Sequence, residues 1–135
     1  MLRAVLEGIA FNHKIHVDAL SDGFSFNQAR LAGGVSRNPI VVQMFADVLA
    51  MPVTVTETDE AAAWGAALCA GAGIGVYSSP QSDPRDVGKI ARTYHPDSDR
   101  SADYRIRYQL FRDIAEAMTP LWPRIGNLAT QHSQG

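Results

Sequence analysis

The chain has 135 residues, 46% of them hydrophobic, which suffices for the core of one small domain. Its formal net charge of −2 disfavours a nucleic-acid-binding surface, which needs a basic stripe. The single cysteine, Cys69, excludes an intrachain disulfide, and its alanine-rich surroundings predict a buried thiol. The apolar run around residues 61–72 is too short for a membrane span and no secretion signal is visible. We therefore expect a cytoplasmic protein with no membrane or nucleic-acid partner.

The first predicted element is a helix over residues 2–20, ended by residues 21–23. One face of it carries Leu2, Val5, Leu6, Ile9, His13, His16 and Leu20. His13 and His16 could share a metal ion, but metal sites need three or four ligands, and Asp18 is the only carboxylate near them. We interpret the pair as part of a structural face and assign no metal site.

A strand, a glycine pair and a helix entry follow. Residues 29–32 form the predicted strand, and Gly33 with Gly34 forms the bend. Asn38 and Pro39 predict a helix start, because Asn caps free N–H groups and Pro needs no donor at the first position. Glycines without Cβ atoms let a ligand approach, and the helix N-terminus attracts an anion. This junction suits a nucleotide crevice in an α/β sheet, although an ordinary tight turn explains the spacing equally well.

The helix over residues 39–50 is predicted from apolar residues at helical spacing, with Gln43 and Asp47 on its opposite, polar face. Pro52 ends the helix before the next strand, residues 53–56, which is rich in β-branched side chains.

An alanine-rich helix over residues 59–72 completes the unit, with Thr58 as its candidate N-cap. Gly65 inside this helix costs about 1 kcal/mol relative to Ala unless a neighbour needs the space. The order strand–helix–strand–helix predicts a right-handed βαβ unit of an α/β fold, in which the strands 29–32 and 53–56 are parallel and adjacent.

The last third of the chain is predicted to be surface connection and one amphipathic helix. The glycines within residues 71–75 follow a helix, which favours a helix C-terminus and disfavours the fingerprint of an NAD-binding dehydrogenase. Residues 78–99 predict a connection with a short helix over 84–92. Residues 102–118 predict the final helix, broken or kinked by two later prolines. Its inward residues are expected to be Tyr104, Tyr108, Phe111, Ile114 and Met118.

Three segments in this order resemble the C-terminal domain of the FGGY carbohydrate kinases, which are ATP-dependent kinases of sugars and polyols. They are the glycine loop with the Gln-Met-Phe-Ala-Asp helix (31–49), the strand 52–55, and the segment with Glu-Ala-Ala-Ala-Trp-Gly-Ala-Ala (57–67). The resemblance implies part of an actin-like ATPase, or ribonuclease H-like, domain with a parallel βαβ unit and a helical C-terminal region. Residues 1–79 would carry the adenosine motif and its packing helices, and 80–135 the surface connection and C-terminal helix.

The resemblance also implies a nucleotide site. Gly33 and Gly34 match the family's adenosine motif, where the backbone passes against the nucleotide. Asn38 matches an Asn that lies beside the adenine in several members, and Ser36 lies in the same loop. Ala32 departs from the pattern, because many members have Gly or Asp at this position.

The implied reaction is transfer of the ATP γ-phosphoryl group, with Mg²⁺ on the phosphates, to a sugar or polyol hydroxyl. FGGY kinases are several times longer, and no residue here matches their catalytic Asp, so we assign no catalytic residue. We expect weak binding of ATP or ADP, and no turnover of a sugar or polyol without the N-terminal domain. Exposed strand edges and helix faces predict a homo-oligomer or a complex with an N-terminal kinase half. The alternative is a non-catalytic, kinase-derived interaction or assembly module, which would not need the intact glycine loop.

Overall fold

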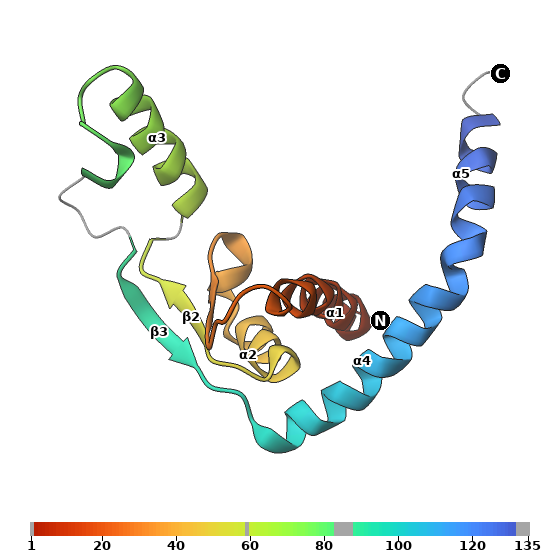
Figure 1. Cartoon of the computed structure of the whole chain (residues 1–135). Coiled ribbons are helices and arrows are strands. Elements are labelled where there is room, and N and C mark those ends of the chain that lie inside the picture. The colour runs from red at the N-terminus through yellow and green to blue at the C-terminus, as the bar shows by residue number, and fades with distance from the viewer. Residues whose placement is uncertain (1, 59, 83–87, 132–135) are drawn as a thin grey trace.

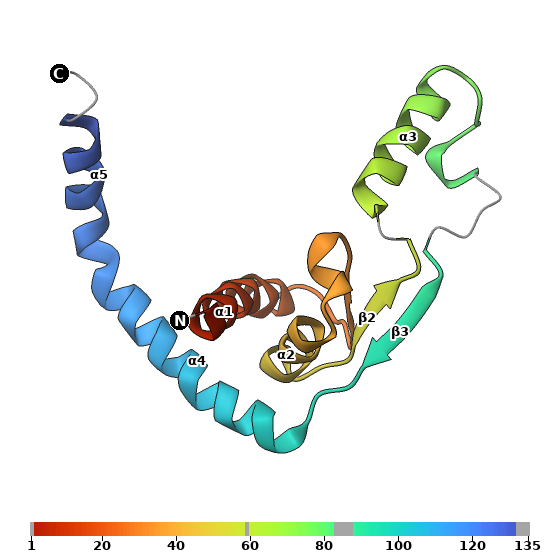
Figure 2. The same ribbon diagram turned by 180° about the vertical axis from the view of Figure 1, so that it is seen from behind.

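The structure, a computed structural model, describes residues 2–58, 60–82 and 88–131. Helix α2 (Pro39–Leu49) packs against a small sheet and is flanked by α1 (Leu2–Ser21) and α4 (Ser98–Met118). Helices α3 (Ala61–Gly73) and α5 (Trp122–Gln131) project from the two ends of an open arc (Figures 1 and 2). The chain is thus α/β, with a helical C-terminal region, as predicted.

The sheet contains β1 (Ala29–Leu31), β2 (Val53–Thr56) and β3 (Ile90–Tyr94), in the order β1-β2-β3. Strands β1 and β2 are parallel and adjacent, which confirms the predicted βαβ unit. Strand β3 runs antiparallel to β2. The helix predicted over 84–92 is therefore wrong for residues 90–92, and residues 84–87 lie outside the described residues. Strand β3 forms hydrogen bonds with the edge of β2 that does not face β1. The sequence predicted that this edge would be exposed, but it is paired.

Helix α2 forms the centre of the core, since eight of its eleven residues are buried. Val42 is fully buried and Phe45 is 4% exposed. The Phe11 ring lies 5.5–6.1 Å from three aromatic rings of α4, measured between ring centroids. The remaining buried apolar residues around α2 are Ala10 of α1, Val53 and Val55 of β2, and Tyr104 and Tyr108 of α4.

The predicted buried face of α1 is largely wrong. Leu2, Val5, Ile9 and Leu20 are each at least 45% exposed. The side that packs carries Leu6, Ala10, Phe11, Ile15 and Val17. This side is selected because both α2 and α4 contact α1, whereas periodicity alone marks an apolar stripe without locating its partners.

Helix α4 differs from its prediction in where it begins and in which residues face inward. Helix α4 begins at Ser98 instead of residue 102, because the Asp97 carboxylate caps it by accepting a 2.9 Å hydrogen bond from the Arg100 N–H. Its inward face includes the buried Tyr104 and Tyr108, but Ile114 is 55% exposed and points elsewhere. The 3-10 helix η3 (Thr119–Leu121) then separates α4 from α5.

Helix α3 differs from its prediction in burial. Leu68 is its only buried residue, and Cys69 is exposed, so the expectation of a buried thiol is wrong. Glu60, not Thr58, occupies the N-cap, without a side-chain capping bond. The helix ends within the predicted glycine stretch, where Gly75 has φ +80°. Among the described residues, no helix combines the length and hydropathy needed to cross a membrane.

Candidate functional site

The loop after β1 is a tight turn built on Gly33. Gly33 has φ +84°, a backbone conformation that favours glycine. The 3-10 helix η1 (Gly34–Arg37) follows it. The Ser36 N–H and hydroxyl both donate to the Gly33 carbonyl, at 3.0 and 2.6 Å. Ser36 therefore closes the loop, and its hydroxyl proton is used inside the turn.

Both glycines of the loop border open space. A Cβ atom added at Gly33 or Gly34 would meet no heavy atom within 4 Å. Gly33 has a conformational reason to be glycine, but Gly34 is not among the positive-φ glycines of the described chain. Neither backbone conformation nor packing within the described chain accounts for the missing side chain at Gly34. The space at this exposed position is open, as it also is at Gly8 and Gly65.

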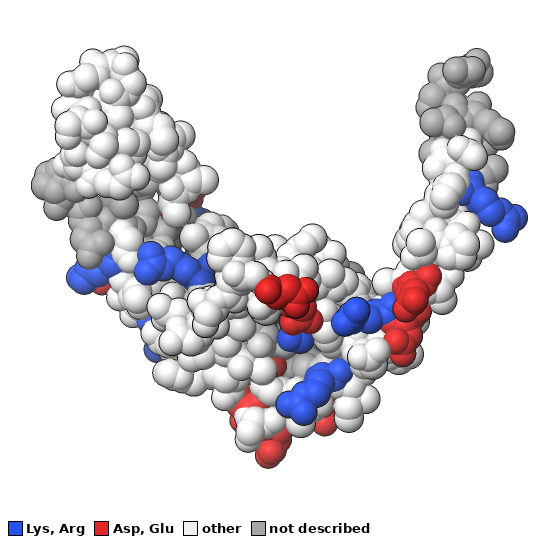
Figure 3. Space-filling model, in the orientation of Figure 1, with Lys and Arg blue, Asp and Glu red and all other residues white. Residues whose placement is uncertain are grey.

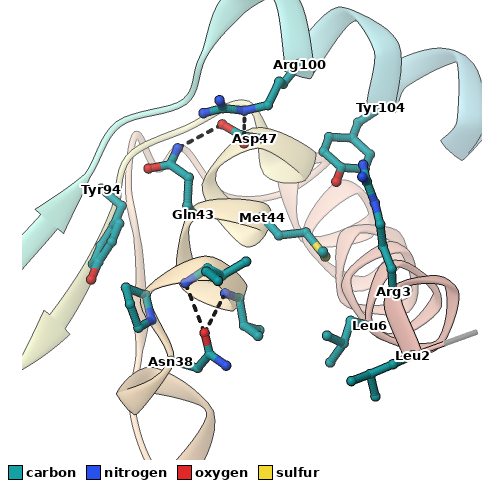
Figure 4. Close-up of a pocket in the computed structure, with 13 residues that line it drawn as sticks. Leu2, Arg3, Leu6, Asn38, Gln43, Met44, Asp47, Tyr94, Arg100 and Tyr104 are labelled. Atoms are coloured by element: carbon teal, nitrogen blue, oxygen red, sulfur yellow. Dashed lines mark hydrogen bonds and ion pairs between the residues drawn. The ribbon is translucent and has the colours of Figure 1, made fainter.

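Asn38 has two separate sets of polar atoms. Its Oδ1 accepts hydrogen bonds from the N–H groups of Ile40 at 3.0 Å and Val41 at 3.4 Å, which caps α2 as predicted (Figure 4). Because both partners are donors, the capping atom must be the amide oxygen. The Nδ2 group of this exposed side chain makes no hydrogen bond to another residue that the structure describes. Asn38 thus caps the helix with one atom and can donate to a ligand with the other.

A largely apolar pocket of about 680 Å³ adjoins Asn38 (Figure 4). This volume lies within the roughly 300–1,000 Å³ typical of small-molecule sites. The residues that line it come from α1, α2, β3 and α4 and include Leu2, Arg3, Leu6, Pro39, Ile40, Val41, Gln43, Met44, Asp47, Tyr94, Arg100 and Tyr104.

The wall of this pocket depends on a buried carboxylate that sequence reasoning misplaced. The sequence placed Asp47 on the face opposite the apolar residues of this helix, but its side chain is buried, at 2% exposure. It accepts hydrogen bonds from Gln43 Nε2 at 2.9 Å, the Asp97 N–H at 2.9 Å and Arg100 Nε at 2.7 Å. Gln43 Nε2 also donates to the His95 carbonyl at 2.8 Å. These bonds fasten the β3–α4 connection to α2.

Two consequences follow from this attachment. It brings Tyr94 and Tyr104 from distant parts of the chain to the pocket. The hydrogen bond to Asp47 also raises the pKa of the Arg100 guanidinium, which therefore stays protonated. The only sequence signal for this arrangement is a Gln–Asp pair four residues apart on an otherwise apolar helix.

An ion pair joins the glycine loop to the start of α3. The guanidinium of Arg37, at the end of η1, contacts the carboxylate of Glu60, the residue before α3. Both side chains are more than half exposed, so the contact adds little stability. It does place the loop and the α3 N-terminus side by side (Figure 1).

The described residues contain no group of three or more His, Cys, Asp or Glu side chains that could hold a metal ion. The donor sets of residues 2–58, 60–82 and 88–131 therefore identify no residue for Mg²⁺.

Comparison with known proteins identifies carbohydrate kinases as relatives of this chain. Residues 1–74 match the model of the FGGY family of carbohydrate kinases, C-terminal domain. The L-xylulose/3-keto-L-gulonate kinase of Escherichia coli (strain K12) is 30% identical over 126 residues, which cover 93% of this chain and 25% of the relative.

Two solved structures share the fold. A ligand-bound xylulose kinase from Lactobacillus acidophilus superposes with a TM-score of 0.72 at 20% identity, covering 91% of this chain and 25% of that one. Plasmodium falciparum glycerol kinase with ADP gives 0.64 at 24% identity, covering 88% and 24%. The chain thus spans about a quarter of the length of the relatives it matches. Because the family model covers more than half of it, this chain belongs to the FGGY family of carbohydrate kinases and corresponds to their C-terminal domain.

Proposed function

We propose that this chain is the adenine-nucleotide-holding segment of an ATP-dependent sugar or polyol kinase. The observation that supports this most is the unused space and unused donor at the β1–α2 junction. Gly34 lacks a side chain where nothing in the described chain would touch one, and Asn38 offers a free amide donor beside an apolar pocket. An adenine ring needs an apolar site with a few directed hydrogen bonds. Of the predicted site residues only Asn38 lines the apolar pocket, and Gly33, Gly34 and Ser36 lie outside it.

Each residue of the site has a proposed task. The backbone at Gly33 and Gly34 lies against the nucleotide, and Asn38 Nδ2 donates to an acceptor nitrogen of the base. Ser36 holds the loop closed and does not contribute its proton to the ligand. Mg²⁺, when bound with ATP, offsets the phosphate charge, and no described residue is assigned to it.

This part of the enzyme positions ATP and does not perform bond chemistry. The acceptor is proposed as a sugar or polyol, since the relatives named above act on xylulose, L-xylulose or 3-keto-L-gulonate, and glycerol. The general base and acceptor-binding residues are assigned to a domain outside this chain. We further propose that residues 1–79 hold the nucleotide, that residues 80–135 complete the domain, and that the reaction is cytoplasmic, where ATP is available.

Titration of the full chain with ATP and ADP by calorimetry tests the site. We expect weak binding, because half of a cleft buries a ligand incompletely. Gly34→Val should abolish binding, since a branched side chain enters the space left for the nucleotide. Gly8→Val is the matched control, because a Cβ at Gly8 in α1 also meets nothing within 4 Å. Equal affinity in the Gly34 variant would contradict the assignment.

Two substitutions at Asn38 separate the cap from the ligand contact. Asn38→Asp retains a capping oxygen but loses the Nδ2 donor, so nucleotide affinity should fall while thermal stability is preserved. Asn38→Ala should lower both. If Asn38→Asp binds ATP as well as the original chain, the base does not contact this side chain.

A coupled kinase assay with pentuloses, glycerol and erythritol tests the expected lack of turnover by the chain alone. Activity should appear only when a separately produced N-terminal kinase portion is added. Turnover by the purified chain alone would show that one of its own carboxylates acts as the base.

A second candidate is the non-catalytic, kinase-derived interaction module. It is favoured by the large apolar side chains left exposed, among them Leu2, Phe24, Ile40 and Ile74. An intact fold that binds neither ATP nor ADP at millimolar concentration would favour this module over the nucleotide-holding segment.

A further inference from the structure

The side-chain amide of Gln43 is held in one orientation by two acceptors. Its Nε2 group donates to Asp47 Oδ1 at 2.9 Å and to the His95 carbonyl at 2.8 Å. An amide nitrogen carries two hydrogens, so both are used in these bonds, and the other atom of the amide is the oxygen. The amide cannot exchange its nitrogen for its oxygen without breaking both hydrogen bonds.

The amide oxygen of Gln43 is an unused acceptor at the wall of the apolar pocket. Oε1 accepts no hydrogen bond from another residue within the described part of the chain. Gln43 is half-buried and lines the pocket beside Asn38. In Figure 4 its nitrogen is turned towards Asp47, and its oxygen points away from Asp47, on the side of Tyr94. A directed acceptor in an apolar wall favours a ligand that brings a hydrogen-bond donor.

The carboxylate that orients this amide is itself fixed. Asp47 is 2% exposed, and it also accepts hydrogen bonds from the Asp97 N–H at 2.9 Å and from Arg100 Nε at 2.7 Å. The direction of Gln43 Oε1 is therefore set by a buried network before any ligand arrives. Such preorganisation increases discrimination between ligands, because the acceptor does not adapt to one that presents a second acceptor.

The polar atoms of the pocket wall match the groups that adenine carries. Asn38 Nδ2 can donate to a ring nitrogen, and Gln43 Oε1 can accept from the 6-amino group, whereas guanine carries an acceptor oxygen at position 6. Asn38 and Gln43 are five residues apart and reach the pocket at different levels of α2. A purine can serve both, because its 6-amino group and its N3 atom lie on opposite edges of the ring.

We propose that Gln43 is a specificity-determining residue, which accepts a hydrogen bond from the 6-amino group of adenine and thereby selects ATP and ADP over 6-oxopurine nucleotides. This inference rests on the nucleotide site proposed above and adds the residue that reads the base. A 6-oxopurine held in the same position turns its oxygen against Gln43 Oε1, and the amide cannot rotate to offer a donor. Two facing acceptors without a hydrogen between them lower the affinity.

A nucleotide series tests this selection on the unchanged full chain, with calorimetry as the measurement. ATP should bind at least about tenfold more tightly than ITP or GTP, since these place an acceptor where a donor is needed. Purine riboside triphosphate has no group at position 6 and should lie between them. Equal affinity for ATP and ITP would overturn the role of Gln43 while the nucleotide site itself stands. Failure of all four nucleotides to bind would overturn both.

Gln43→Met tests the residue, because methionine has a similar length but no amide. The ratio of ATP to ITP affinity should fall towards one, through weaker binding of ATP and stronger binding of ITP. A merely structural role would change both affinities by the same factor, and an unchanged ratio would overturn the proposal. If this variant does not fold, as judged by circular dichroism, the nucleotide series on the original chain decides.

Gln109→Met is the matched control. Gln109 also donates to an aspartate four residues later, Asp113, at 2.9 Å, but it is exposed on α4 and does not line the pocket at Asn38. The ratio of ATP to ITP affinity should therefore stay at its original value in this variant. An equal fall of the ratio in the Gln43 and Gln109 variants would overturn the assignment to Gln43.

Discussion

Helices α2 and α3 are both mostly apolar, yet the chain buries only one of them. Eight of the eleven α2 residues are buried, whereas Leu68 is the single buried residue among thirteen in α3. Residues 61–82 contain no charged side chain, and Figure 3 shows this lobe as an uncharged surface. Helix α2 contacts β2, β3, α1 and α4, while α3 packs mainly on the short 3-10 helix η2 (Pro80–Ser82).

The difference shows that apolar composition leads to burial only where neighbouring elements supply a matching surface. Helix α2 has one because α1, α4 and the sheet converge on it. Helix α3 exposes apolar atoms at Ala62, Ala63 and Ala66, and Ile74 follows them. A contiguous uncharged surface of this kind is typical of a contact face for another protein segment.

The contrast between α2 and α3 predicts that the largest loss of stability follows a substitution of Phe45 in α2. Phe45→Ala leaves a cavity at the centre of α2 and should lower the free energy of unfolding by about 3–5 kcal/mol. Leu68→Ala in α3 should cost about 2 kcal/mol, the lower end for a leucine, because Leu68 lies outside the core cluster around α2. Urea unfolding followed by circular dichroism measures both. Equal losses would show that α3 is packed as firmly as α2.

A second prediction concerns how the β3–α4 connection attaches to α2. Asp47→Ala leaves the Asp97 N–H and the Gln43 amide without their shared acceptor and should cost about 1–3 kcal/mol. The loss of the Arg100 ion pair adds little, since the half-exposed guanidinium can be solvated. Near-ultraviolet circular dichroism should show loosened tyrosine packing. Asp99→Ala, at the exposed start of α4, is the control, and a loss as large in this variant would argue against the buried network.

The parts of the fold that the sequence predicts correctly rest on local physics. The β-branched residues 53–56, the periodicity of residues 39–50 and the Asn38 cap each follow from neighbours within one turn or strand. The parallel pairing of β1 with β2 follows from the handedness of the crossover.

The parts that it misses depend on contacts between distant residues. Strand β3 forms because β2 offers an unpaired edge. Asp47 can be buried because Asp97 and Arg100 donate hydrogen bonds to it, and these residues lie about fifty positions further along the chain. No local pattern gives either contact. The glycine loop can be located from sequence, but the pocket beside Asn38 cannot, because α4 and β3 supply part of its wall.

A third prediction concerns the pH dependence of the packed core around α2, to which Tyr108 of α4 belongs. The pKa of Tyr108 is raised to about 12. Burial is the larger cause, and the second is the 2.7 Å hydrogen bond that the Tyr108 hydroxyl donates to Asp18. The folded chain thus retains this proton more tightly than the unfolded chain, whose tyrosines titrate near 10. The stabilisation is complete below about pH 10 and is lost as the pH rises towards 12.

Urea unfolding at several alkaline pH values measures this loss, and Tyr108→Phe is the control because it removes the ionisable group but retains the ring. The difference in stability between the two chains should change between pH 10 and 12. A constant difference over this range would mean that Tyr108 ionises as freely when folded as when unfolded.

The smallest expected effect has the opposite sign and lies in α3. Gly65 is inside the helix, where glycine costs about 1 kcal/mol relative to Ala, and a Cβ there would meet no heavy atom within 4 Å. Gly65→Ala should therefore stabilise α3 by about 0.5–1 kcal/mol. Because α3 is sparsely packed, the gain should appear as slower amide hydrogen exchange within residues 61–73, with little change in the unfolding of the α2-centred core.

Gly71→Ala is the contrasting variant, since its added Cβ would lie 2.9 Å from the Tyr77 ring, and it should speed exchange in α3. Faster exchange in the Gly65 variant would mean that a segment packs against this glycine and needs the space that a methyl group would fill.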